Sequence, residues 1–307
     1  MGLQVTQEMF VPAPPTAASA EAITRPSLSF WADAWRRLKQ NRLATASMYV
    51  LVVIVLFALV APILSHYRFS DQDLTAIGQG PSWRHLLGTD DLGRDLWTRL
   101  WVGGRVSLCI GLLAGALDLA IGVLYGGISG YFGGKVDDVM MRIVEILFGI
   151  PYLLMIILLM VVMGQGLLTM ITALGLVSWI GMARLVRGQV LQLKEQEYVL
   201  AARTLGAGHL RLIVRHVIPG ALGPIIVALS FTVPGAIFAE AFLSFLGLGV
   251  PLPMASWGTL ADDGFRLMRL YPWMLIFPSL VLMLTILAFY LFGDGLRDAL
   301  DPTLRNK

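Results

Sequence analysis

Long uncharged apolar stretches alternate along this chain with segments that carry nearly all of its charge. An α-helix rises ~1.5 Å per residue, so about 20 consecutive apolar residues cross the ~30 Å hydrocarbon core of a bilayer. Six stretches meet this criterion: one at 43–64, a second at 106–132, a third and a fourth within 146–183, a fifth at 217–239 and a sixth at 273–292. The pattern therefore predicts an all-α integral membrane protein with six transmembrane helices.

The second predicted span contains a repeat of small residues. Glycine recurs every four residues along it, at Gly122, Gly126, Gly130 and Gly134. A stripe of small residues lets the backbone of a neighbouring helix approach closely. We therefore expect this span to be a packing helix.

Glycine and proline mark the breaks between spans. Gly164 and Gly166 predict a tight turn between the third and fourth helices, and Gly293 and Gly295 are expected to end the sixth. Residues 242–260 are uncharged but interrupted by several glycines and prolines. A re-entrant or capping loop is expected there rather than a span.

These boundaries divide the chain into five parts. The first, residues 1–42, is a tail with no signal-peptide pattern, ending in a short helix whose Trp31 and Trp35 alternate with basic residues. That mixture favours a helix at the membrane interface, and a soluble amphipathic helix packed on a partner is the alternative. The other parts are the span at 43–64, an extracytosolic segment at 65–105, a five-helix membrane core at 106–292 with a charged cytosolic segment at 184–216, and a C-terminal tail at 293–307.

The distribution of basic residues predicts the orientation. With both termini in the cytosol, 16 of the 23 lysines and arginines fall in cytosolic segments and seven fall on the other side. Basic residues concentrate on the cytosolic side of membrane proteins. Both termini and residues 184–216 are therefore expected in the cytosol.

Composition excludes several classes of function. Hydrophobic residues make up 57% of the chain and charged residues 14%, whereas soluble domains carry roughly 25% charged residues. The net charge of +3 is too small and scattered for a nucleic-acid surface. One cysteine, four histidines without ligand spacing and the lack of a phosphate-binding loop predict no metal site, no cofactor and no catalytic residue on this chain.

Residues 195–219 have a pattern that the spans do not share. Glutamates at its start favour a helix N-terminus, Gly206 can adopt the left-handed cap conformation, and Pro219 marks the entry into the fifth span. Between them, Ala201 and Ala202 leave a shallow helix face. Such a helix can insert into a groove on a soluble partner. A surface loop that only connects two spans is the alternative.

This segment resembles the EAA loop, the ATPase-coupling helix of binding-protein-dependent ABC importers. That motif has Ala-Ala, then Gly and, thirteen residues later, Pro, and the spacing recurs here. Leu200 replaces the usual glutamate and His216 the usual isoleucine, so Glu197 would supply the charge. The resemblance implies an ATPase-coupling site at Glu197, Ala201, Ala202, Arg203, Gly206 and Pro219.

Four further motifs are similar to those of peptide and nickel transporter permeases, specifically the second permease of dipeptide and oligopeptide importers. They are HLLGTDDLGRD at 85–95, GYFGG at 130–134, LSFLGLG at 243–249 and GDGLRD at 293–298. The resemblance implies the transmembrane domain of a type I ABC importer in the bacterial inner membrane, working by alternating access. It implies a second homologous permease, two ATPase subunits that hold ATP and Mg²⁺, and an extracytosolic peptide-binding protein.

Other charged residues are candidates with two interpretations each. A carboxylate in mid-span is costly, so Asp118 is expected either to line the translocation pathway or to be a protonated or locally bonded structural residue. Glu240 lies near a span end and is expected to be interfacial, with a pathway role as the alternative. The cluster of Asp90, Asp91, Arg94 and Asp95 is expected to form a self-satisfied turn network or to dock the binding protein.

Two other functions remain open at this point. A permease of the same family that imports nickel or another small solute would share these motifs. A proton-coupled secondary transporter could use Asp118, Glu145 and Glu240 as a proton relay, although no internal repeat typical of such folds is evident.

Overall fold

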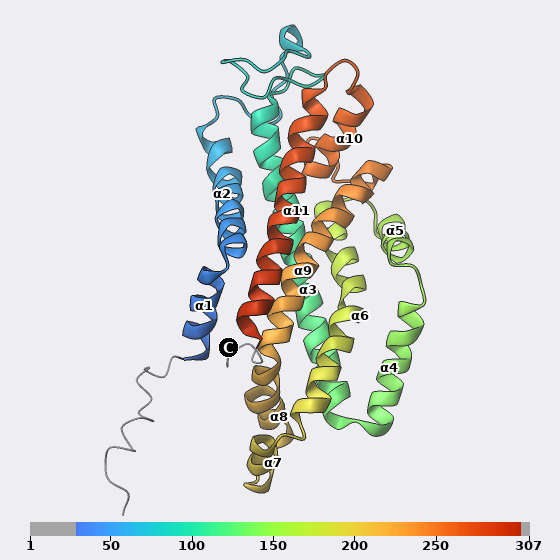
Figure 1. The fold of residues 1–307 in the computed structure, drawn as a ribbon. Coiled ribbons are helices and arrows are strands. Elements are labelled where there is room, and N and C mark those ends of the chain that lie inside the picture. The colour runs from blue at the N-terminus through green and yellow to red at the C-terminus, as the bar shows by residue number, and fades with distance from the viewer. Residues whose placement is uncertain (1–28, 302–307) are drawn as a thin grey trace, which may run out of the picture.

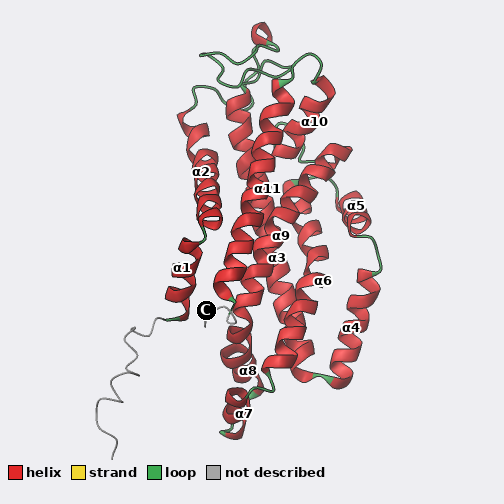
Figure 2. Cartoon of the chain, in the orientation of Figure 1, coloured by secondary structure: helices red, strands yellow, loops and turns green. Residues whose placement is uncertain are grey.

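The computed structural model describes residues 29–301, and the expected tails at 1–28 and 302–307 lie outside the described residues. Within that range the chain folds into helices joined by loops, and no strand forms beyond one isolated bridge between Thr89 and Asp95 (Figure 2). The helices are α1 (Phe30–Gln40), α2 (Arg42–Leu64), α3 (Leu96–Phe132), α4 (Gly134–Phe148), α5 (Tyr152–Met163), α6 (Leu167–Leu193), α7 (Glu197–Thr204), α8 (His209–Leu212), α9 (Ile218–Leu243), α10 (Trp257–Leu267) and α11 (Trp273–Leu300).

Five helical segments of the described chain are long and apolar enough to cross a membrane: α2, α3, α6, α9 with its flanking turns, and α11. A sixth span is present if α4 and α5 are counted together, although an angle of 85° separates them. The third helix predicted between 146 and the turn at Gly164 is therefore not continuous, because α4 ends at Phe148 and α5 begins at Tyr152. Gly149 and Pro151 lie at the break, and proline cannot continue the hydrogen-bond ladder of α4.

Helix α3 begins at Leu96, ten residues before the predicted start of the second span at 106. The Asp95 carboxylate caps it by accepting from the Thr98 amide at 2.9 Å. The arginines that suggested a solvated loop have partners in the fold, since the Arg105 guanidinium donates to the carbonyls of Ala58 and Leu59 at 2.6 and 2.7 Å. These bonds let a charged stretch continue the helix, so the boundary of the predicted segment 65–105 moves back to 95.

Helix α11 runs through Gly293 and Gly295 to Leu300, so the predicted end of the last span at these glycines is wrong. Both glycines are sites of close packing. A Cβ on Gly293 would lie 2.6 Å from the Ser230 hydroxyl, and one on Gly295 would collide with Ala44. The predicted tail at 293–307 therefore starts as helix, and α1 packs against this end of α11 through Leu38 and Ala299.

The predicted N-terminal amphipathic helix is present as α1. Trp31 and Trp35 are about half exposed, and the Lys39 ammonium lies 5.0 Å from the centre of the Trp35 ring. In Figure 1, α1 lies at the same end of the molecule as α7 and α8, whereas the 65–95 segment and α10 lie at the opposite end. The two ends of the described chain thus share one side.

Helices α3 and α6 pack backbone to backbone at the centre of the molecule. A Cβ on Gly122 would lie 2.5 Å from Met182, one on Gly126 would collide with the Ala183 carbonyl, and one on Gly130 would lie 2.8 Å from the Arg187 carbonyl oxygen. The predicted packing stripe is confirmed at these three positions. Gly134 is the exception, because it begins α4 at a φ of +51° with nothing near it.

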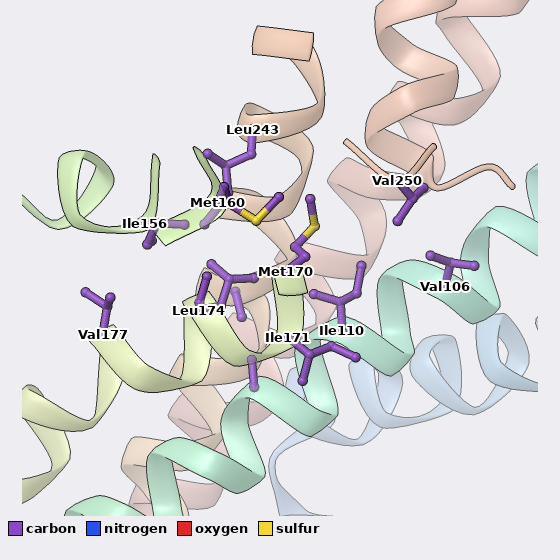
Figure 3. Close-up of a cluster of buried hydrophobic side chains, with 14 residues drawn as sticks. Val106, Ile110, Ile156, Met160, Met170, Ile171, Leu174, Val177, Leu243 and Val250 are labelled. Atoms are coloured by element: carbon purple, nitrogen blue, oxygen red, sulfur yellow. The ribbon is translucent and has the colours of Figure 1, made fainter. Parts of the chain in front are cut away.

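The main apolar core lies where α3, α5, α6 and α9 meet. Figure 3 shows Ile110, Met160, Met170 and Leu174 pointing toward one another from three of these helices. Met160 and Met170 are almost fully buried, and methionine commonly fills irregular gaps in such cores. This core holds the short helix α5 against α6 despite the break that precedes it.

The segment predicted as a re-entrant or capping loop at 242–260 contains a π-turn, an extended stretch and the start of α10. Ser256 caps α10, and the backbone of Ser256 would lie 3.1 Å from a Cβ on Gly103 of α3. The Trp257 indole donates to the Leu100 carbonyl at 3.0 Å. The segment is thus fixed against the first turns of α3.

Candidate coupling and pathway sites

The helix, glycine turn and helix predicted at 195–219 are present as α7, the turn at Gly206, and α8 with the π-turn Ile213–Val217. Gly206 ends α7 with a φ of +85°, and the Ala207 amide closes the turn by donating to the Ala202 carbonyl at 3.1 Å. Helix α6 extends to Leu193, so the first ten residues of the predicted segment 184–216 belong to that span. The remainder projects beyond the spans (Figure 1).

Apolar side chains both anchor this element and cover its surface. Val199 and Leu212 are buried against Val186 and Val190 of α6. Leu205, Leu210 and Val214, in contrast, are 88%, 76% and 60% exposed. We call α7, the Gly206 turn and α8 the coupling element. Exposed apolar residues on a rigid, anchored element are typical of a docking surface for another protein.

The residues predicted to couple differ in exposure. Ala201, Arg203 and Gly206 are exposed, as are Glu197 at the start of α7 and Pro219 in the first turn of α9, whereas Ala202 is half-buried against the apolar cluster. The structure therefore puts five of the six at the surface. Leu205 and Leu210 were missed, because a leucine in an apolar-rich sequence gives no sign of being outside.

A hydrogen bond links the coupling element to the central helix. The Tyr131 hydroxyl lies 3.0 Å from Nδ1 of His209, which joins the last turn of α3 to the first residue of α8. Lys194 donates to the Gly130 carbonyl at 3.0 Å from the end of α6. The first bond thus ties the coupling element to α3, and the second ties the end of α6 to α3.

The acidic and basic cluster before α3 forms a turn network at the opposite end of the molecule. The Asp90 carboxylate accepts from the backbone of Leu92 and from Arg94 Nε at 2.6 Å, and Arg99 Nε lies 3.4 Å from the same oxygen. His85 Nδ1 lies 2.9 Å from Asp95. Of the four predicted docking residues, Asp90, Arg94 and Asp95 are buried and only Asp91 is exposed.

A further carboxylate joins this network from α10. Burial raises the pKa of Asp263, while Arg99 and Arg94 pull it down. This proximity could not be predicted from the sequence, since Asp263 lies 164 positions beyond Arg99. The network therefore lies where α10 meets the start of α3, and a docking role for it stays a prediction.

Glu240 lies inside α9 and has no exposed surface. Three serine hydroxyls donate to its carboxylate: Ser107 of α3 at 2.9 Å, Ser244 at 2.8 Å and Ser256 at 2.6 Å. The expectation that Glu240 is interfacial is therefore wrong, whereas Glu145, another carboxylate of the proton-relay alternative, is exposed beside Arg142. Glu240 joins α3, α9 and the cap of α10, and its predicted pathway role stays a prediction.

Asp118 lies in α3 with 1% of its surface exposed. Its Oδ1 atom is buried without a hydrogen-bond partner among residues 29–301, and the carboxylate reaches the Thr232 side chain of α9. No group of three or more histidine, cysteine or acidic side chains that could hold a metal occurs within that same range.

Comparisons with known proteins give this arrangement a family. The model of the binding-protein-dependent transport system inner membrane component matches residues 122–306. A second model, the N-terminal transmembrane domain of oligopeptide transport permease C, matches residues 29–81. The chain belongs to the binding-protein-dependent transport permeases.

Two curated relatives of this permease come from Bacillus subtilis. The oligopeptide transport system permease protein OppC is 53% identical over 301 residues, covering 98% of this chain and 99% of the relative. The dipeptide transport system permease protein DppC is 52% identical over 303 residues, covering 98% and 95%. Among solved structures, a chain of the inward-facing methionine ABC transporter MetNI matches with a TM-score of 0.53 and 21% identity, over 66% of this chain and 96% of that one, which shows the shared fold.

Replacing Glu240 with alanine is expected to destabilise the permease strongly. The change leaves the buried hydroxyls of Ser107, Ser244 and Ser256 without their shared acceptor, which should cost about 3 kcal/mol or more. Thermal unfolding in a mild detergent measures the loss, and Glu240→Gln, which keeps an acceptor oxygen, should lose less. The control Glu145→Ala changes an exposed glutamate and should alter the stability by about 0.5 kcal/mol at most. Equal unfolding temperatures for Glu240→Ala and Glu145→Ala would contradict this role.

Proposed function

We propose that this chain forms one half of the translocation pathway of an ATP-driven importer for dipeptides and oligopeptides. The two relatives that share more than half of its residues across nearly its whole length are named as peptide permeases. Within this chain, the structure of the coupling element supports the proposal. It has an anchored helix, an exposed small-residue face and exposed leucines beyond the spans.

The proposed assembly contains a second homologous permease, two ATPase subunits and an extracytosolic peptide-binding protein. ATP and Mg²⁺ bind to the ATPase subunits, and each ATPase receives one coupling element in a surface groove. Both termini of this chain lie in the cytosol with the coupling element. This fits the structure, because α1, the end of α11 and the coupling element share one end of the molecule (Figure 1).

The proposed cycle is alternating access. Closure of the ATPase pair on ATP moves both coupling elements and opens the spans toward the binding protein, which delivers the peptide. Hydrolysis then returns the spans to the inward-facing state. The bond from Tyr131 to His209 supports a mechanical link between the coupling element and α3. The bond from Lys194 to Gly130 joins α3 to the end of α6, which the coupling element follows in the chain.

The test is ATP hydrolysis by the complete importer in proteoliposomes, with its binding protein and either a peptide mixture or nickel. Stimulation by peptides is expected. Stimulation by nickel alone would keep the assembly and replace the substrate. Uptake in liposomes that lack any ATPase subunit would favour proton coupling and contradict the proposal.

A further inference from the structure

A cavity of about 500 Å³ lies between α5, α6 and α9. Its wall is mainly apolar and aromatic, but each of these helices contributes one hydroxyl-bearing residue to it, at Tyr152, Ser178 and Thr232. The Thr232 hydroxyl donates to the Ala228 carbonyl at 3.2 Å, so it can act as an acceptor for a further group. Phe148, at the end of α4, completes the rim, and both Phe148 and Tyr152 are exposed. Small-molecule sites commonly have this size and this mixture of apolar wall and few polar groups.

The carboxylate of Asp118 on α3 is not among the residues that line the cavity, but it lies next to one of them, Thr232. The Asp118 side chain reaches Thr232, and its charge acts on Tyr152, so two groups of the lining lie within its influence. Its Oδ1 atom has no hydrogen-bond partner among the described residues. An unpartnered carboxylate in mid-membrane is costly and is expected to have a partner during function.

The lining itself supplies no cation for Asp118, since none of its residues is basic. The Arg184 guanidinium lies over the Phe148 ring, 4.6 Å from the ring centre. Within residues 29–301, then, no basic side chain bonds to Asp118 or lines the cavity, and a cationic solute in the cavity could balance the ionised carboxylate. At neutral pH most free amino termini of peptides carry a positive charge, and ammonium groups are also attracted by aromatic rings such as those of Phe148 and Tyr152.

From these contacts we infer that the cavity is a transit site for the positively charged amino group of the solute, with Asp118 as its countercharge and Thr232 and Tyr152 as hydrogen-bonding groups. This inference rests on the proposed function in taking the solute to be a peptide. It assigns to this half of the pore a ligand chemistry of its own, separate from the selectivity of the binding protein.

The electrostatic part can be measured with a cysteine reporter. Cys109 is the only cysteine of the chain, so Cys109→Ser gives a background in which a new cysteine reports alone. Gly181 lines the cavity, and a Cβ there meets nothing within 4 Å. In the complete importer in nanodiscs, the preference of Gly181→Cys for a trimethylammonium methanethiosulfonate over its sulfonate analogue should exceed that of a cysteine outside the cavity roughly tenfold. Mass spectrometry of this chain follows both reactions.

Asp118→Asn should remove most of that preference for the cationic reagent. The matched control is Gly188→Cys on the same helix. A Cβ on Gly188 also meets nothing within 4 Å, but Gly188 does not line the cavity. Its preference between the two reagents should not change with Asp118→Asn. Ser178→Cys is a second reporter in the cavity. An unchanged preference at both reporters, or no reaction with either reagent at both, would overturn the inference.

The amino-group part uses trialanine and N-acetyl-trialanine as probes. Trialanine should slow the modification of Gly181→Cys at least severalfold more than the acetylated peptide, and Asp118→Asn should abolish that difference. Equal protection by the two peptides would contradict recognition of the amino group. Peptide-stimulated ATP hydrolysis by the Cys109→Ser parent reports separately on the proposed function. If that stimulation is normal but the cysteine variants do not show the expected preference or protection, only the transit site is rejected.

The inference also predicts an effect on peptide uptake by the complete importer. Asp118→Asn should lower peptide uptake per ATP hydrolysed at least severalfold at normal protein levels. The control is Thr285→Val. It removes a hydroxyl of α11 that is as buried as Asp118, donates to the Val281 carbonyl at 2.7 Å and lies outside the cavity. Uptake should change little in that variant. Normal uptake per ATP in Asp118→Asn would overturn the inference.

Discussion

Replacing Gly126 with alanine is expected to destabilise the permease by about 3 kcal/mol or more, because the added methyl group collides with the Ala183 carbonyl of α6. The colliding atom belongs to the backbone, so a change of side-chain rotamer cannot relieve the overlap. The two central helices must separate instead. For a chain of this size the loss corresponds to a fall in unfolding temperature of roughly 5–10 °C, measurable by thermal unfolding in detergent.

The adjacent glycine provides the control. A Cβ on Gly127 meets only the Ile218 side chain, at 3.4 Å, which is an ordinary contact. Gly127→Ala therefore adds the same methyl group to the same helix without a clash, and should leave the stability unchanged or slightly improved, since alanine favours the helix. If both variants unfold at the same temperature, α3 and α6 do not pack as closely as the structure shows.

Replacing Gly206 with aspartate is expected to separate ATP hydrolysis from peptide uptake in the complete importer. Gly206 is exposed and has no neighbour within 4 Å of a Cβ, so the new side chain meets no clash. Its φ of +85° strains an aspartate, a cost that the control below shares. The new side chain adds bulk and charge to the surface proposed to enter an ATPase groove. A loss of about 1.4 kcal/mol or more at that contact lowers binding at least tenfold, and uptake per ATP should fall with it.

Gly164→Asp is the matched control for that variant. Gly164 also has a positive φ, of +83°, and nothing within 4 Å of a Cβ, but it lies at the other end of α6. Its uptake should remain near normal. Ala201→Asp should reproduce the loss, because Ala201 is exposed, whereas Ala202→Asp would also disturb the apolar cluster that Ala202 contacts. Normal uptake in both Gly206→Asp and Ala201→Asp would mean that the segment only connects two spans.

Most of the spans could be predicted from the sequence because their signal is local. A run of apolar residues identifies α2 and α9 to within a few positions of their observed ends. The predicted start of α3 and the predicted end of α11 were wrong because the contacts that decide them are distant in the sequence. There, charged residues and glycines that suggest a loop are accommodated by distant partners, Ala58 and Leu59 for Arg105 and Ala44 for Gly295.

The candidate sites also differ in whether neighbouring or distant residues form them. The coupling element was predictable, since its helix, turn and helix are encoded within 25 consecutive residues. The surroundings of Glu240 were not, because one of its serines lies 133 positions away on α3. Asp118 could be identified by the cost of placing a carboxylate in a membrane, but its neighbour Thr232 and the cavity beside it depend on how α9 packs against α3.

The length of α3 has a mechanical consequence. Its 37 residues contain no proline and extend about 55 Å at ~1.5 Å per residue, well beyond the ~30 Å hydrocarbon core. One end contacts His209 of the coupling element and the other is held by Asp95 in the network at the far side. A tilt about its packed midpoint would move these ends in opposite directions. A movement of the coupling element on one side of the membrane would therefore displace the network on the other side through α3.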